Sequence, residues 1–152
     1  MEKKNKGSKS SNNEELEIED FINLGVILND KDEVLMIRRV EEEVGRDGSV
    51  LTWAFPGGKQ RFNESRSECV KREVLVETGY DIYSIREISL RYHPQFPVGI
   101  VYHFCRLVSQ KPIAEPNEPH EIAEIRWVKS QEIRGLITTD LDPKVAQELG
   151  LR

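Results

Sequence analysis

The chain has 152 residues, of which 38% are hydrophobic and 7% aromatic, as is ordinary for one globular domain with a sizeable core. Its net charge of −5 argues against a protein that grips a long polyanion such as a nucleic acid, whereas a small phosphorylated ligand is compatible with local basic groups or a metal ion. No apolar run approaches the length of a membrane span and no secretory signal begins the chain, so we expect a cytoplasmic protein.

Residues 1–19 are rich in lysine, serine, asparagine and glutamate and contain almost no apolar side chain. Such a segment has too little apolar surface to fold by itself, so we expect a flexible tail followed by a single domain at residues 20–152. The two cysteines, Cys69 and Cys105, lie inside segments that otherwise suggest a helix and a strand. We interpret them as reduced core residues rather than as a disulfide or a metal pair.

Two apolar segments, at residues 21–28 and 34–40, are separated by polar residues. This pattern predicts a β-hairpin. Arg38 and Arg39 end its second strand, and we expect one of them to be exposed and the other to face a ligand cleft, although two surface arginines are an equal alternative. We take Arg38 as the candidate substrate ligand.

Residues 41–50 are charged and contain two glycines, which predicts a loop. A short strand follows and ends before the pair Gly57 and Gly58. Glycines at this point let the backbone turn tightly and bring its carbonyl groups toward a bound ion. The pair therefore predicts a turn that can also contact a metal.

A helix is predicted from Ser65, which forms a capping box with Glu68, to the stop signal Gly79, with Asn63 as an alternative N-cap. On this helix Glu73 and Glu77 lie on the same side, about 6 Å apart along the axis. Two carboxylates so close repel each other unless a cation bridges them, and Mg²⁺ and Mn²⁺ prefer carboxylate and carbonyl oxygens. The pair indicates a divalent-metal site, with a solvated charged face as the alternative.

Three further strands, a loop and two helices complete the chain in an order that is hairpin-like rather than a regular βαβ alternation. The strands are expected at residues 81–90, 98–108 and 121–128, the loop at 91–97, and the helices at 130–134, capped by Ser130, and from Asp142 to near Gly150.

The histidines and tryptophans have more ordinary interpretations. His103 alternates with apolar neighbours along a predicted strand and is expected to be structural. His93 and His120 lie in loops and are candidates to contact a base or a phosphate, although lone loop histidines usually do neither. Trp53 and Trp127 are expected in the core rather than as stacking platforms.

From Gly58 onward the chain resembles the signature of the Nudix hydrolase family. That signature is Gly, five residues, Glu, seven residues, Arg-Glu, an aliphatic residue, one residue, Glu-Glu, one residue, Gly and an aliphatic residue. Six of its seven fixed positions are matched without a gap, and Val76 replaces the first glutamate of the Glu-Glu pair. The matching residues are Gly58, Glu64, Arg72, Glu73, Glu77 and Gly79, with Val74 and Tyr80 at the aliphatic positions.

The resemblance implies an α/β fold in which a curved, mixed β-sheet lies between helices as an α/β/α sandwich. It also implies a divalent ion, Mg²⁺ or Mn²⁺, and expects Arg72 to orient a glutamate by a charge-assisted hydrogen bond. Because Val76 removes one carboxylate, we expect weaker or fewer ions. The implied metal ligands are the Gly57 carbonyl and the side chains of Glu64, Glu73 and Glu77.

Two further pairs of charged residues lie close to this motif in the implied fold. Glu118 and Glu121, in a later acidic loop, are candidates for an additional metal-binding or base glutamate, with plain surface charge as the alternative. Lys59 and Arg61 make the first part of the motif more basic than it is in the family pattern. They suit a phosphate-rich substrate, or they are surface charge.

The implied activity is hydrolysis of a pyrophosphate bond in a nucleoside diphosphate linked to another moiety, with water as the nucleophile. The expected partner is a small-molecule nucleotide of open identity, and the oligomeric state, a homodimer included, is also open. The alternative is a Nudix-fold module that binds a nucleotide without cleaving it, which Val76 favours. The residues assigned to catalysis are Arg72, Glu73, Glu77, Glu118 and Glu121, and those assigned to the substrate are Arg38, Lys59 and Arg61.

Overall fold

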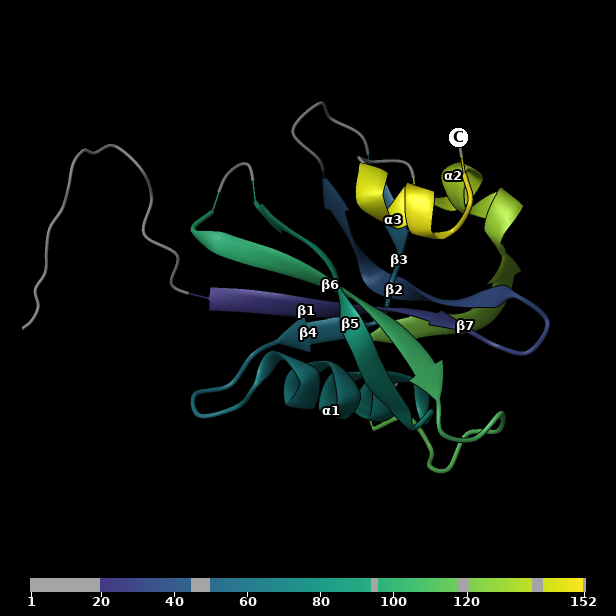
Figure 1. The fold of residues 1–152 in the computed structure, drawn as a ribbon, viewed down its shortest axis with the longest axis horizontal. Coiled ribbons are helices and arrows are strands. Elements are labelled where there is room, and N and C mark those ends of the chain that lie inside the picture. The colour runs from purple at the N-terminus through teal and green to yellow at the C-terminus, as the bar shows by residue number, and fades with distance from the viewer. Residues whose placement is uncertain (1–19, 45–49, 94–95, 118–120, 138–140, 152) are drawn as a thin grey trace, which may run out of the picture.

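A computed structural model describes residues 20–44, 50–93, 96–117, 121–137 and 141–151 (Figure 1). The predicted tail at residues 1–19 and the candidates Glu118 and His120 lie outside these described residues. The elements, in chain order, are β1 (Asp20–Leu28), β2 (Glu33–Val44), β3 (Val50–Ala54), β4 (Gly57–Lys59), α1 (Arg66–Thr78), β5 (Ile82–Tyr92), β6 (Val98–Leu107), β7 (Ile122–Lys129), the 3₁₀ turn η1 (Ser130–Glu132), α2 (Ile133–Leu136) and α3 (Pro143–Glu148).

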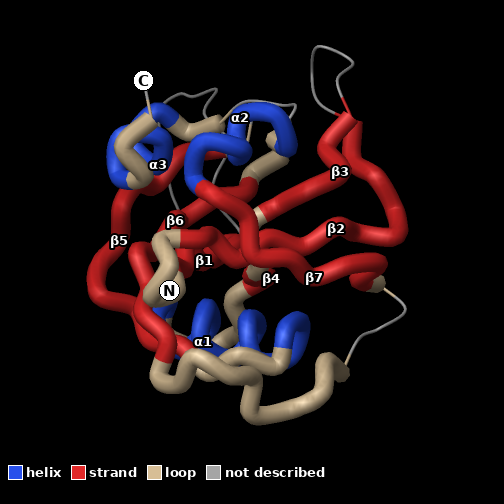
Figure 2. Tube along the Cα trace, turned by 90° about the vertical axis from the view of Figure 1, so that its right-hand side faces the viewer, coloured by secondary structure: helices blue, strands red, loops and turns tan. Residues whose placement is uncertain are grey.

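The seven strands form one mixed sheet. The strand order is β3-β2-β1-β6-β5, with β4 paired to β1 and β7 paired to β2. The β1–β6 pair is parallel and the others are antiparallel. Helix α1 covers one face of this sheet, and α2 and α3 lie on the other face (Figures 1 and 2). The predicted α/β/α arrangement with a mixed sheet is therefore confirmed.

Strand β2 shows how the sheet builds a core on each face. Successive strand residues point to opposite faces, so Val34 and Met36 pack in the cluster that contains Ile133 of α2. Leu35, between them, packs instead in the cluster that contains Val74 of α1. Because both faces of β2 are buried, the strand reads as an unbroken apolar run rather than as an alternating one.

Helix α1 begins and ends where the sequence predicts. The Ser65 side chain accepts a hydrogen bond from the Glu68 amide, and the Glu68 side chain accepts one from the Ser65 amide, which completes the capping box. Gly79 ends the helix in the left-handed conformation, with φ of 82°. A β-carbon on Gly79 would also lie 2.1 Å from the Ala114 carbonyl oxygen, so glycine is needed there for space as well.

The predicted hairpin forms, but it is not the main pairing of its first strand. β1 and β2 meet in register at Leu28 and Val34. Along its whole length β1 pairs with β6, from Asp20 opposite Val98 to Leu28 opposite Arg106. The sequence cannot reveal this partnership, because the two strands are separated by most of the domain.

Three local predictions are wrong at their edges. Residues 41–44 and Val50 belong to β2 and β3 rather than to a loop, since pairing between these strands overrides their charged composition. Residues 57–59 form the short strand β4 instead of a simple turn, because they pair with β1. Ser130 does not cap the helix after β7, where Lys129 is the N-cap residue and makes no side-chain capping bond.

The cysteines and Trp53 are buried as predicted. Burial raises the pKa of the Cys69 thiol to about 11 and that of the Cys105 thiol to about 12, so both stay protonated at neutral pH. Both thiols are free. Trp53 is 8% exposed and lies in the core cluster on the α2 side of the sheet.

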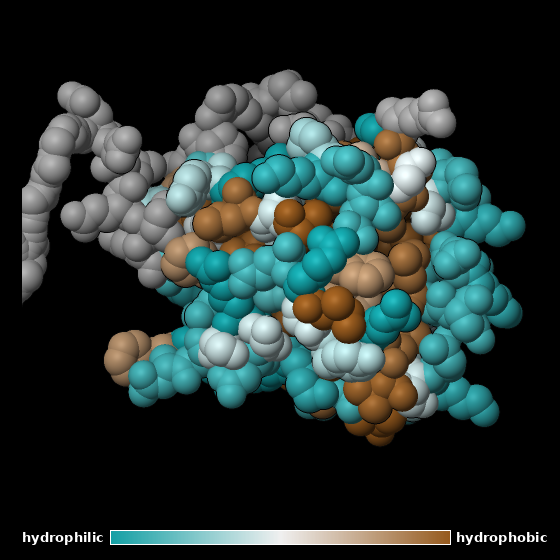
Figure 3. Space-filling view, in the orientation of Figure 1, coloured by the Kyte–Doolittle hydropathy of each residue, from teal (hydrophilic) through white to brown (hydrophobic). Residues whose placement is uncertain are grey.

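The face shown in Figure 3 is largely hydrophilic. On the face in Figure 3, apolar side chains form separate patches among hydrophilic ones. Among the described residues, Phe62 is the most exposed large apolar side chain, at 93%. It lies in the loop between β4 and α1. None of the helices in the described part of the chain has the length and apolar character that a bilayer span requires.

Candidate active site

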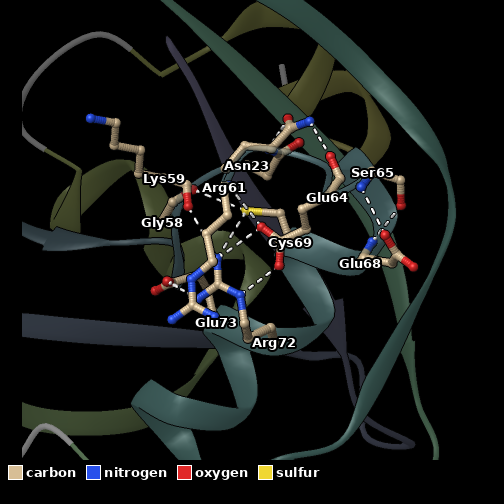
Figure 4. Close-up of polar contacts among 11 residues, drawn as sticks. Asn23, Gly58, Lys59, Arg61, Glu64, Ser65, Glu68, Cys69, Arg72 and Glu73 are labelled. Carbon is tan, nitrogen blue, oxygen red and sulfur yellow. Dashed lines mark hydrogen bonds and ion pairs between the residues drawn. The ribbon is translucent and has the colours of Figure 1, made fainter.

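The candidate site lies where β4, the start of α1 and the loop between them meet (Figure 4). We call residues 60–65 the motif loop. Its last residues lead directly into the capping box of α1, so the orientation of the helix and the path of the loop are set together. This arrangement places the motif side chains along the edge of the helix that faces β4.

Arg72 joins the carboxylates of Glu64 and Glu73. Its Nε lies 2.6 Å from Glu64 Oε2 and its Nη2 lies 2.9 Å from Glu64 Oε1, a two-point contact. Its Nη1 lies 2.5 Å from Glu73 Oε2, and Nη2 also donates to the Lys59 carbonyl at 3.2 Å. One guanidinium group therefore fixes two carboxylates and the end of β4 (Figure 4).

Glu64 is held in its ionised form. The pKa of the carboxyl is lowered from 4.5 to about 2, mainly by its hydrogen bond with Arg72 and also by the Arg61 amide, which donates to Oε1 at 2.9 Å. The same pairing raises the pKa of the Arg72 guanidinium. Glu64 therefore remains a carboxylate over the whole neutral range.

Gly58 leaves the space that the Glu73 carboxylate occupies. A β-carbon on Gly58 would lie 2.4 Å from Glu73 Oε1 and 2.6 Å from Cδ, closer than such atoms approach. The glycine at this position thus permits a carboxylate to lie directly against the backbone of β4.

Glu77 is buried and is held from two sides. Its Oε1 accepts a hydrogen bond from the Gly57 amide at 2.9 Å, and its Oε2 lies 3.5 Å from Arg39 Nη1. Burial of a carboxylate is costly unless it is paired and hydrogen-bonded, and both conditions are met here.

The structure separates the two arginines at the end of β2. Arg39 faces Glu77, whereas Arg38 Nε lies 3.4 Å from Glu124 Oε1 and its guanidinium carbon lies 6.0 Å from the ring centre of Trp53. The sequence left open which of the two arginines faces the cleft, and Arg38 was our candidate, whereas the structure brings Arg39 to Glu77. The signal was present, since adjacent strand residues point to opposite faces, but which face holds the site depends on where α1 packs.

The remaining candidates lie around this centre. Lys59 is 66% exposed and its Nζ lies 3.3 Å from Asp20 Oδ2, and Arg61 is exposed in the motif loop. Glu121 is exposed, and its carbonyl accepts a hydrogen bond from the Val40 amide, next to Arg39. Val76 is half-buried, and its carbonyl accepts a hydrogen bond from the Asn117 amide.

The donor set suits a magnesium-type ion that is bound partly by substrate. Within the described ranges, no three His, Cys, Asp or Glu side chains are placed to hold a metal by themselves. Mg²⁺ is usually held by one or two carboxylates, with phosphate oxygens of the substrate and waters at the other positions. Glu73 and Glu77 supply carboxylates of this kind beside a glycine backbone, so the residues fit such an ion.

Residues 22–148 match the family model of the NUDIX domain. The chain belongs to the NUDIX family. A Bacillus subtilis (strain 168) protein named as an 8-oxo-dGTP diphosphatase is 27% identical over 103 residues, which cover 68% of this chain and 62% of that protein. The match thus spans less than two thirds of this relative's length.

Solved structures give the same family picture. The MutT protein from Methanosarcina mazei Go1 is 25% identical, with a TM-score of 0.60 and coverage of 86% of this chain and 90% of that one. A NUDIX hydrolase from Nitrosomonas europaea, 22% identical with a TM-score of 0.62, covers 84% of both chains and supports the fold alone. The family resemblance seen in the sequence is therefore confirmed over nearly the whole described domain.

Proposed function

We propose that this NUDIX protein is a pyrophosphohydrolase that uses Mg²⁺ or Mn²⁺ to cleave a pyrophosphate bond in a nucleoside diphosphate linked to another moiety. The observation that carries the proposal is the placement of Glu73 and Glu77. Both carboxylates lie against the Gly57–Gly58 backbone. Glu73 occupies the space that a side chain at position 58 would fill, and Glu77 accepts a hydrogen bond from the Gly57 amide. A solvated helix face would not be built into the backbone in this way.

The bound metal would draw negative charge from the pyrophosphate oxygens and lower the pKa of the attacking water. The protein's own groups prepare this site. Arg72 orients Glu64 and Glu73 and keeps Glu64 ionised, and the Gly57 amide fixes one oxygen of Glu77. Arg39, on the other oxygen of Glu77, offers further donors to a phosphate group of the substrate.

A glutamate near Arg39 would accept the proton of the attacking water. Glu121 is the described candidate, because it precedes β7 next to the strand that presents Arg39. Glu118, the other candidate from the sequence, lies outside the described residues. We assign the base to Glu121 and leave Lys59 and Arg61 as contacts for outer phosphates of the substrate.

The test is product analysis by chromatography. The panel contains nucleotide sugars, ADP-ribose, dinucleoside polyphosphates and nucleoside triphosphates, including 8-oxo-dGTP, for which the Bacillus subtilis relative is named. Each compound is incubated with Mg²⁺ or Mn²⁺, and with a chelator as the control. We expect metal-dependent release of a nucleoside monophosphate from at least one of them, and no turnover of any compound would contradict the proposal.

A nucleotide-binding module without hydrolysis is the second candidate, and one observation favours it. Val76 occupies the position of a family glutamate and contributes no charge to the site. Nucleotide binding measured by calorimetry, with no product formed from any member of the panel, would select this alternative. The retained Arg72, Glu73 and Glu77 favour the hydrolase.

A further inference from the structure

A set of buried polar side chains lies beneath the motif loop and is not explained by metal or substrate binding. Asn23 of β1 and His103 of β6 are both 0% exposed. His103 Nε2 lies 2.8 Å from Asn23 Oδ1, and His103 Nδ1 lies 2.8 Å from Ser84 Oγ on β5. Three neighbouring strands thus place polar side chains in one line, which is buried at Asn23 and His103 and half-buried at Ser84.

The line continues into the motif loop. Asn23 Nδ2 donates to Gln60 Oε1 at 3.1 Å, and Gln60 Nε2 donates to the Glu64 carbonyl at 2.7 Å. Glu64 is the residue whose carboxylate Arg72 holds at two points. A chain of four hydrogen bonds therefore connects the far strand β5 to the carboxylate cluster.

All four bonds can have the same direction. Because the Asn23 amide nitrogen donates to Gln60, its oxygen faces His103, and the proton of a neutral imidazole is then on Nε2. The unprotonated Nδ1 accepts from the Ser84 hydroxyl. Burial lowers the pKa of His103, which favours this neutral form.

Asn23 has a second connection to the same site. In the β1–β4 ladder it lies opposite Gly58, the glycine that makes room for Glu73. The Gln60 amide also donates to the Phe21 carbonyl on β1 at 2.8 Å. The backbone hydrogen bonds between β1 and β4 position β4. The hydrogen bonds between side chains position the motif loop that follows it.

We propose that Ser84, His103, Asn23 and Gln60 form a positioning relay that sets the path of the motif loop and thereby the geometry of the metal-binding carboxylates. Apolar residues of similar volume would fill the same space without the cost of burying polar groups. The relay therefore has a directional role that packing alone does not supply. This inference rests on the proposed metal site and adds residues on β5 and β6 to its support.

The first measurement is the affinity for Mn²⁺ in the absence of nucleotide. It is obtained from the electron paramagnetic resonance signal of free Mn²⁺. Gln60→Ala cuts the relay at its partly exposed end, where folding is least at risk, and His103→Phe cuts it in the core. We expect both to weaken Mn²⁺ binding about tenfold or more, the scale seen for groups that orient metal ligands. His103→Gln retains a donor and an acceptor and should restore most of the affinity.

Cys105→Ala is the matched control, because Cys105 is buried two residues further along the same strand and its thiol donates to the His103 backbone carbonyl rather than to a side chain of the relay. It should reduce stability without changing Mn²⁺ affinity. A second readout is hydrogen exchange of the Arg61 amide, which donates to Glu64. We expect faster exchange in Gln60→Ala and His103→Phe than in the control.

The outcomes separate this inference from the proposed function. Wild-type protein that binds Mn²⁺, with Gln60→Ala and His103→Phe both at wild-type affinity and exchange rate, would overturn the relay and leave the metal site standing. Wild-type protein that binds no Mn²⁺, either alone or with nucleotide present, would overturn the metal site and the relay together. A loss in Cys105→Ala equal to that in His103→Phe would show that general packing is responsible, which also contradicts the relay.

Discussion

Two guanidinium groups divide the carboxylates of the site between them. Arg72 takes Glu64 and Glu73, and Arg39 takes Glu77. Each carboxylate is therefore partly neutralised before any metal arrives, which allows three acidic groups to be held close together. A divalent ion would add positive charge to this group of carboxylates and arginines, and the phosphates of a substrate would add negative charge.

The residue on which the proposed chemistry depends most is Glu77. Glu77→Gln keeps the shape of the side chain and an oxygen for the Gly57 amide but removes the charge. We expect kcat to fall by roughly two orders of magnitude or more, because a neutral amide is a poor metal ligand. Steady-state kinetics with a saturating metal concentration checks this, with the exposed Glu132→Gln as the control. An unchanged kcat would remove Glu77 from the mechanism.

Glu64 should contribute stability that depends on pH. Its pKa is lowered from 4.5 to about 2 in the folded chain, so its stabilising effect is complete above 4.5 and is lost as the pH falls toward 2. The difference in free energy of unfolding between wild type and Glu64→Gln should therefore be constant above about pH 5 and shrink below that. Urea unfolding with chelator present measures it, and a difference that does not change down to about pH 3 would contradict the pairing with Arg72.

At the scale of elements, α1 depends on its two ends. The capping box fixes its start, and Gly79 both stops it and accepts hydrogen bonds from the Ile113 and Ala114 amides. The segment after β6 is thereby attached to the C-terminal end of the helix. The helix that presents the carboxylates is thus anchored at both ends as well as along its buried face.

Gly79→Ala should be more destabilising than Gly150→Ala. Both glycines have positive φ, 82° and 75°, but a β-carbon on Gly79 meets the Ala114 carbonyl at 2.1 Å, whereas one on Gly150 meets nothing within 4 Å. Gly150→Ala should cost about 1–2 kcal/mol, from the backbone conformation alone. Gly79→Ala should cost clearly more, and equal losses in urea unfolding would show that the close contact is not important.

Val76 is the position on α1 where the family signature is incomplete. Val76→Glu restores the missing carboxylate one turn after Arg72 and should tighten Mn²⁺ binding by about tenfold. Val76→Gln, similar in size but uncharged, is the control and should have no such effect. Equal Mn²⁺ affinities of the glutamate variant and wild type would mean that this side of the helix does not face the ion.

At the scale of the whole molecule, the residues of the site come from three elements, and each of these elements contacts β1. Strand β4 pairs with β1, β2 meets it at Leu28 and Val34, and Val70 of α1 packs against Gly25. These elements present Gly57, Arg39 and the motif glutamates respectively. A shift of any one of them against β1 would change the distances within the site.

Removal of residues 2–19 should leave this assembly intact. The family match begins at residue 22, and the composition of the preceding segment predicts a tail. We expect the truncated protein to keep its Tm, with a change in stability below about 0.5 kcal/mol, and its kcat/KM. Thermal unfolding and kinetics on the substrate from the panel test this, and a large fall in kcat/KM would assign the segment a role in catalysis.

The sequence by itself determined the features that depend on near neighbours along the chain. Local rules predict the capping box at Ser65, the stop at Gly79, the spacing of Glu73 and Glu77, and the Asp142 cap of α3, and the structure shows each of these features. The function of the two glutamates stays a prediction. The motif also identified the family, because its fixed positions span a single loop and helix.

The tertiary structure decided what depends on residues far apart in the chain. The contact of Arg39 rather than Arg38 with Glu77, the pairing of Gly57–Lys59 with β1, and the parallel β1–β6 ladder depend on which elements pack together. The line of hydrogen bonds from Ser84 to Gln60 was equally hidden, since His103 looked like a single polar residue in an apolar strand. Hydrogen bonds and packing between such distant segments leave no periodic signal in the sequence, because each segment satisfies only its own half of the contact.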